Sequence, residues 1–105
     1  MFLYELAQDG QSVIVYFKGD LDIEATEILE EISQELRAFE AIQINLAEVP
    51  FVDSTGIGLL IHLVETLKRE NKQVMISDMQ PEVEEVFDII QLKEILGEEI
   101  FVKTK

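Results

Sequence analysis

Ser54 lies in the tetrapeptide Asp53-Ser54-Thr55-Gly56, immediately before an apolar stretch that has the spacing of a helix. A side chain at such a boundary can cap the helix by accepting hydrogen bonds from its free first-turn amides, and from chemistry alone capping is the most common role of a serine there. A hydroxyl at a loop-to-helix junction is also accessible to a kinase. A phosphate would add roughly −1.5 to −2 charges, which the helix amides would favour and Asp53 would oppose.

Catalysis by Ser54 finds no support in the rest of the chain. A nucleophilic serine needs a base within hydrogen-bond reach and a third group that orients the base. The only histidine, His62, lies eight residues further along the same expected helix, and that separation corresponds to about 12 Å of helical rise. With no cysteine and no EF-hand pattern of carboxylates, the usual metal sites are also disfavoured. We expect no catalytic residue, no metal and no cofactor, and so a protein that is not an enzyme.

The carboxylates Asp20, Asp22 and Asp53 permit a second chemistry, that of a receiver domain in which Asp53 accepts a phosphoryl group and the other two bind Mg²⁺. In that fold the acidic pair ends the first strand of a parallel sheet, and a lysine lies near the end of the fifth. Here Asp20 and Asp22 follow an expected hairpin, and neither residues 74–78 nor the tail supplies a lysine in place. The receiver interpretation is therefore strongly disfavoured.

The elements that must position these residues alternate between strand and helix. Residues 3–7 and 12–18 have the composition of strands and flank Asp9-Gly10, a strong hairpin signal. Asp22 suits the N-cap of the helix that follows. The order β-β-α-β-α-β-α-β predicts a single α/β domain over residues 1–105 with a mixed sheet. The helix after Asp22 has an apolar stripe from Ala25 to Phe39, and the later elements are expected at residues 41–46 (strand), 54–70 (helix), 73–77 (strand), from Pro81 onward (helix) and 100–102 (strand).

The expected helix over residues 54–70 has apolar residues on two sides. Leu59 and Leu63 fall nearly opposite the side that would pack on a sheet. Two interpretations stay open: another helix covers these leucines, or they form a patch for a partner or for a second copy in a homo-oligomer. The core side of this helix comprises Ile57, Leu60, Ile61, Val64 and Leu67, and that of the third helix Val83, Val86, Phe87 and Ile90.

Length and charge limit the classes of protein to which the chain can belong. Its 105 residues are 48% hydrophobic and carry a formal net charge of −14, which fits one folded domain and disfavours binding to nucleic acid or to an anionic membrane. A basic partner surface is favoured instead. No cysteine, no signal peptide and no apolar run near the roughly twenty residues that span a bilayer are present. We therefore expect a soluble, cytoplasmic protein.

Three segments together carry a resemblance to a known family. They are Gly19-Asp20-Leu21-Asp22 after the second strand, Ile44-Asn45-Leu46 in the third, and Phe51-Val52-Asp53-Ser54-Thr55-Gly56-Ile57-Gly58 at the start of the following helix. In this order and spacing they resemble the STAS domain, and within it the bacterial anti-sigma-factor antagonists. The resemblance covers essentially the whole chain, and Val86-Phe87-Asp88-Ile89 also fits it.

The resemblance implies a partner-switching regulator of transcription. In that cycle the unphosphorylated antagonist binds an anti-sigma factor with serine kinase activity, which then releases its sigma factor. The same partner phosphorylates the serine after the aspartate, which is Ser54 here, and a metal-dependent serine phosphatase restores the active form. We expect Ser54 to cap the helix when bare and to act as a charge switch when phosphorylated. Partner contact is expected at Asp20, Asp22, Asp53, Thr55, Gly56, Ile57, Gly58 and Leu59.

The same family supplies an alternative. The stretch Leu60-Ile61-His62-Leu63 resembles STAS subunits of bacterial lipid-transport systems, which bind a transporter ATPase and are not phosphorylated switches. A non-phosphorylated interaction module, either a transporter subunit or a regulatory scaffold, therefore stays open, although a serine after Asp53 argues against it. The family often ends in a further helix, whereas only Lys103-Thr104-Lys105 follows the last expected strand.

Overall fold

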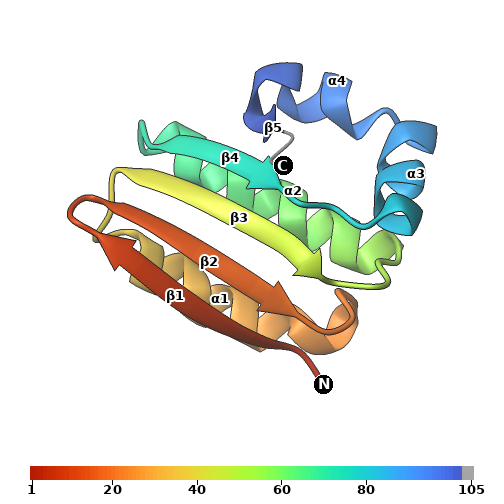
Figure 1. The fold of residues 1–105 in the computed structure, drawn as a ribbon, viewed down its shortest axis with the longest axis horizontal. Coiled ribbons are helices and arrows are strands. Elements are labelled where there is room, and N and C mark those ends of the chain that lie inside the picture. Colours follow the sequence, from red (N-terminus) through yellow and green to blue (C-terminus); the bar gives the residue numbers. More distant parts are fainter. Residues whose placement is uncertain (103–105) are drawn as a thin grey trace.

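The computed structural model describes residues 1–102, and the tail Lys103-Thr104-Lys105 lies outside them. In chain order its elements are β1 (Leu3–Asp9), β2 (Ser12–Lys18), the short 3-10 helix η1 (Ile23–Ala25), α1 (Thr26–Leu36), β3 (Ala41–Glu48), α2 (Ser54–Arg69), β4 (Gln73–Ser77), α3 (Pro81–Ile89), α4 (Leu92–Leu96), the 3-10 helix η2 (Glu98–Ile100) and β5 (Phe101–Val102). The strands form one sheet in the order β1-β2-β3-β4-β5, and α1 and α2 pack on one face of it (Figure 1). The predicted α/β class with a mixed sheet is confirmed. No helix within residues 1–102 is long and apolar enough to cross a bilayer.

The direction of the strands brings the loops that follow β2, β3 and β4 to one edge of the sheet. β1 and β2 form an antiparallel hairpin that turns at Gly10, whose φ of 62° costs a glycine little. β2, β3, β4 and β5 run parallel to one another. Alternate residues of the inner strands are buried beneath the helices, among them the paired Val15 and Ile44. Because the inner strands are parallel, the loops that follow β2, β3 and β4 all emerge at the same edge.

Tyr4 links the edge strand β1 to α1 through hydrogen bonds. Its hydroxyl oxygen lies 2.9 Å from a carboxylate oxygen of Glu31 and 2.9 Å from one of Glu35, so its single hydrogen is donated to one of them at a time. Burial, followed by these hydrogen bonds, raises the pKa of the Tyr4 hydroxyl above its ordinary value. The hydroxyl therefore remains a neutral donor throughout the physiological pH range.

Leu63 does not lie on the surface, so of the two interpretations left open the exposed patch does not hold for it. It is 3% exposed because α1 lies beside α2 and gives that helix a second buried side. Leu59 is half-buried, and together with His62 it lines a groove of about 320 Å³ between the two helices. For Leu63 the interpretation that another helix covers it is confirmed.

The region after β4 departs from the expectation in two respects. α3 ends at Ile89, and Ile90 is 36% exposed, so placing Ile90 in the core is wrong. Gln91 adopts a left-handed backbone with φ of 59°, which ends the helical periodicity on which that placement rested. The five-residue helix α4, which buries Leu92 and Leu96, was also not predicted.

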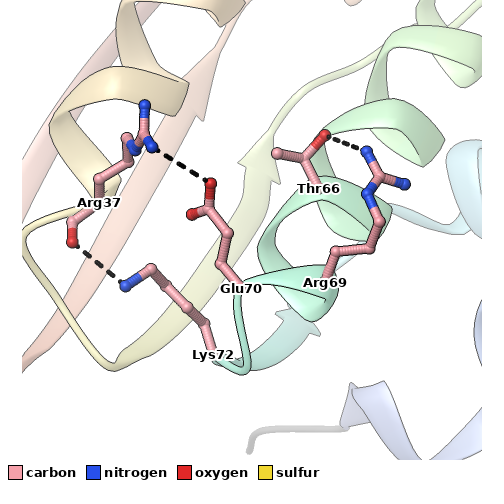
Figure 2. A network of polar contacts seen from close by, with 5 residues as sticks. All are labelled: Arg37, Thr66, Arg69, Glu70 and Lys72. Carbon is pink, nitrogen blue, oxygen red and sulfur yellow. Dashed lines mark hydrogen bonds and ion pairs between the residues drawn. The ribbon is translucent and has the colours of Figure 1, made fainter.

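Cationic side chains join the C-terminal ends of α1 and α2 (Figure 2). Arg37 Nη2 lies 3.7 Å from Glu70 Oε2. Lys72 Nζ donates a hydrogen bond to the Arg37 carbonyl oxygen at 3.1 Å. Positive charge is favourable at a helix C-terminus because it faces the negative end of the helix dipole. These contacts link α1 and α2 at the end opposite to the loops that follow β2 and β3.

Leu63→Ala is expected to lower the free energy of unfolding by about 2–4 kcal/mol, because it removes buried apolar surface and leaves a cavity between α1 and α2. The matched control is His62→Ala, an exposed neighbour, which should change stability by less than about 0.5 kcal/mol. Urea denaturation followed by circular dichroism measures both. Equal effects from the two variants would show that α1 does not cover Leu63.

Candidate functional site

Two loops, residues 19–22 after β2 and residues 49–53 after β3, pair with each other at the edge of the sheet. Leu21 and Val52 form an isolated parallel bridge. The Leu21 amide donates to the Phe51 carbonyl oxygen at 2.9 Å, and the Asp53 amide donates to the Leu21 carbonyl oxygen at 3.3 Å. Two segments far apart in the sequence are thereby fixed side by side at the start of α2.

Gly56 allows the first turn of α2 to pack directly on the paired loops. A Cβ atom added at Gly56 would overlap the Leu21 carbonyl oxygen. At Gly58, by contrast, an added Cβ would meet nothing within 4 Å. The close approach that Gly56 permits is therefore made by the protein's own backbone, whereas Gly58 opens onto free surface.

Asp53, not Ser54, caps α2. Asp53 Oδ1 accepts a hydrogen bond from the Gly56 amide at 2.8 Å, and its backbone is extended, as an N-cap requires. Ser54 is the first residue of the helix, it is exposed, and its hydroxyl makes no hydrogen bond within residues 1–102. The expectation that the bare serine caps the helix is wrong. Because Asp53 already provides the side-chain cap, the Ser54 hydroxyl is free for other chemistry.

Asp22 has a similar structural role one loop away. Its Oδ1 accepts from the Glu24 amide at 3.0 Å. The predicted cap at Asp22 is confirmed, although it begins the 3-10 helix η1, which leads into α1, and not an α-helix directly. Asp20, two residues earlier, is exposed. The loop thus offers one free carboxylate and one that is engaged in capping.

The residues predicted to contact a partner differ in their exposure. The exposed ones lie around the start of α2 and in the adjacent loop, and the buried ones hold α2 against the rest of the protein. Asp20, Ser54, Thr55 and Gly58 are exposed, Asp22, Asp53 and Leu59 are half-buried, and Gly56 and Ile57 are buried.

Polar side chains at the ends of β3 and β4 hold the loop that leads to Ser54. Asn45 Nδ2 donates to Asp78 Oδ2 at 2.9 Å, and Asn45 Oδ1 accepts from the Ala47 amide at 2.9 Å. Gln80 Nε2 donates to the Ala47 carbonyl oxygen at 2.8 Å. Asp78 and Gln80 were not singled out from the sequence, since only the fold brings the residues before α3 next to the end of β3.

The chain segments that lead to Ser54 and into α1 are acidic. No lysine or arginine occurs between Lys18 and Arg37, or between Arg37 and Lys68. Lys18 itself is paired with Glu5 at 3.1 Å. The two loops and the first turn of α1 therefore carry carboxylates and no lysine or arginine within the same segments, a surface suited to a basic partner.

Sequence reasoning missed two exposed apolar residues at this edge. Ile23 begins η1, and Phe51 lies in the loop before α2. From sequence alone, a single apolar residue in a loop is ordinarily assigned to the core, because its neighbours in space are not known. The one sequence feature that could have pointed to them is their closeness to the paired loop residues: Ile23 lies two residues after Leu21, and Phe51 directly precedes Val52.

The site can accept a group from another protein more readily than it can perform a reaction itself. His62 is exposed on α2 and lies eight positions after Ser54, a separation that corresponds to about 12 Å of helical rise. That separation places it beyond the reach of a general base. An accessible serine hydroxyl at a helix N-terminus, surrounded by carboxylates, is instead suited to modification by an external kinase.

Residues 4–105 match the family described as the STAS domain. The chain belongs to the STAS-domain family. A relative of this STAS domain, the anti-sigma-B factor antagonist of Staphylococcus epidermidis, is 31% identical over 80 residues, which make up 74% of this chain and 74% of the relative. Family membership also sets aside the receiver interpretation of the carboxylates.

Solved structures share the fold of this STAS domain. The anti-sigma factor antagonist SpoIIAA in its unphosphorylated form superposes with a TM-score of 0.75 at 24% identity, covering 98% of this chain and 89% of that chain. The phosphorylated form of SpoIIAA, a cell fate determinant of Bacillus, gives a TM-score of 0.72 at 23% identity, covering 98% of this chain and 92% of that chain. At these identities the likeness concerns the fold.

Gly56→Ala is expected to lower the melting temperature, because the new Cβ must displace the Leu21 backbone. Gly58→Ala, in the same helix turn but facing open space, is the matched control. It should raise stability by about 0.5–1 kcal/mol, since alanine favours helix over glycine. Thermal unfolding followed by calorimetry compares the two. Stabilisation by both substitutions would contradict the close contact between α2 and the Leu21 loop.

Proposed function

We propose that this STAS domain is an anti-sigma factor antagonist, a non-catalytic regulator that binds an anti-sigma factor while Ser54 is unmodified. The observation that carries the proposal is the free, exposed hydroxyl of Ser54 at the first position of α2, beside an aspartate that already caps the helix. The 31% identity to an anti-sigma-B factor antagonist supports it.

Reversible phosphorylation is compatible with the local structure. Because Asp53 provides the cap, esterification of the Ser54 hydroxyl breaks no hydrogen bond within residues 1–102. The positive end of the α2 dipole favours a phosphate, whereas the carboxylates of Asp20, Asp22 and Asp53 oppose it. The fold can therefore stay as it is while the local charge changes by roughly −1.5 to −2.

Charge at the interface explains how such a modification would release a partner. A protein that docks over unmodified Ser54 buries a neutral hydroxyl. After phosphorylation it would have to bury a dianion beside several carboxylates, and burial of an unpaired charge is strongly unfavourable. Phosphorylation would therefore act by exclusion at the contact surface and not by unfolding α2.

The proposed cycle has three components besides this chain. An anti-sigma factor with serine kinase activity would dock on the Ser54 surface and later phosphorylate it. A sigma factor would be freed while the antagonist is bound. A serine phosphatase would remove the phosphate and restore binding, and all of these steps would take place in the cytoplasm.

Incubation with ATP and a candidate anti-sigma factor kinase from the same organism is expected to place one phosphate on Ser54, mapped by mass spectrometry. Ser54→Ala should abolish the modification because no acceptor hydroxyl remains. Thr55→Ala, which removes the neighbouring exposed hydroxyl, is the matched control and should be phosphorylated like the parent. Phosphate on Thr55, or an acyl phosphate on Asp53, would contradict the proposal.

Ser54→Asp is expected to weaken binding of the same anti-sigma factor by at least about tenfold, equivalent to about 1.4 kcal/mol, because it places a charge where the partner accepts a neutral group. Ser54→Ala should bind within about twofold of the parent. Isothermal titration calorimetry measures both. If the aspartate variant binds as tightly as the parent, exclusion by charge is not the mechanism, and a STAS module that is never phosphorylated becomes the better description.

A further inference from the structure

Ile23 and Phe51 are large apolar side chains that the fold leaves in solvent. They are 67% and 51% exposed, respectively. Neither belongs to the hydrophobic core, and neither is among the half-buried residues that pack against it. The adjacent Val52 and the nearby Leu21 are buried, so both loops already contribute to the core without these two side chains.

The pairing of the loops brings these residues to the same part of the surface. Phe51 accepts, through its carbonyl oxygen, the hydrogen bond from Leu21, and Ile23 lies two residues beyond Leu21. Ser54 follows Phe51 by three residues and begins the helix that packs on this loop. The apolar residues therefore adjoin the proposed phosphorylation site, and exposed apolar groups beside a polar rim characterise interaction surfaces.

We infer that Ile23 and Phe51 are the apolar anchors of the docking surface around Ser54, and that the partner's matching face is an apolar pocket bordered by lysine or arginine side chains. The inference rests on the proposed function and adds to it the chemistry of the partner. The two anchors are bordered by Asp20, Asp22 and Asp53, with no cation of the same chain between Lys18 and Arg37. A pocket with a basic rim complements both the apolar and the charged groups.

The same charges argue against a second copy of this chain as the occupant. Each copy has a net charge of −14, and a symmetric contact through Ile23 and Phe51 would bring the two acidic rims together. Like charges opposed across an interface are unfavourable. A basic partner meets no such penalty.

The two kinds of contact have separable effects on binding. Anchors buried in a pocket contribute mainly to the lifetime of the complex, and alanine truncation of such residues commonly accounts for most of the lost affinity. Rim carboxylates contribute mainly to the association rate and its dependence on salt. A merely structural role for Ile23 or Phe51 would produce neither pattern, since it would appear as a loss of folding stability.

The test measures binding of the same anti-sigma factor by surface plasmon resonance, using the full chain. Phe51→Ala and Ile23→Ala are each expected to raise Kd by about tenfold or more through faster dissociation, with melting temperatures close to that of the parent. Asp20→Asn should instead slow association and reduce its salt dependence. Ile95→Ala is the matched control, because Ile95 is 53% exposed and lies beside Lys68 and Arg69, about 21 Å of helix away from Ser54.

Each outcome of this test has a defined meaning. Anchor variants that bind within about twofold of the parent, while Ser54→Asp loses binding, would overturn the anchor inference and leave the proposed function intact. A parent protein that neither binds the anti-sigma factor nor is phosphorylated would overturn both. Loss of self-association in the anchor variants, seen by analytical ultracentrifugation with partner binding unchanged, would overturn the inference in favour of a second copy as the occupant.

Discussion

The contact between the first turn of α2 and the backbone at Leu21 determines the arrangement of the whole site. Two backbone hydrogen bonds join the loop after β2 to the loop before α2, and the missing side chain of Gly56 lets the helix pack against their junction. The hydrogen bonds hold the two loops together, and the close approach at Gly56 places the start of α2, with Ser54, against them. Asp20 and Ser54 thereby belong to one surface, and the sheet edge acquires a fixed shape on which a partner can dock.

In this packing the neighbouring residues Asp53 and Ser54 have different roles. Asp53 provides the side-chain cap of α2, so Ser54 does not serve as the cap and remains exposed. If the serine were the cap, phosphorylation would have to break the cap and would risk fraying α2. Because the aspartate performs that role, modification can alter the surface of the molecule without altering its fold.

Much of the architecture could be predicted from local signals. The turn at Gly10, the alternation of the strands and the cap at Asp22 are properties of a few adjacent residues, and these predictions are confirmed. The cap of α2 could not be assigned in this way, because Asp53, Ser54 and Thr55 all have suitable oxygens. Only the backbone conformation, extended at Asp53 and helical from Ser54, selects one of them.

The remaining errors arise from packing between distant segments. A helical wheel drawn for a helix on a sheet leaves Leu63 in solvent, and it cannot know that α1 lies alongside. The helical wheel for α3 continues through Ile90 because nothing in the local sequence predicts the left-handed backbone conformation of Gln91. The exposure of Phe51 could not be predicted from the sequence either, since an apolar residue before a buried valine is ordinarily assigned to the core.

The separation of charge along the molecule has a consequence for how a complex forms. Carboxylates gather around Ser54, while Arg37 and Lys72 lie at the opposite ends of the helices (Figure 2). Such a molecule experiences a torque in the field of a basic surface and arrives with its Ser54 end leading. Phosphorylation strengthens that torque, since it adds negative charge to the leading end. The modified protein would thus still be drawn to its partner and be turned away only at contact, so the switch would act on residence time and not on collision frequency.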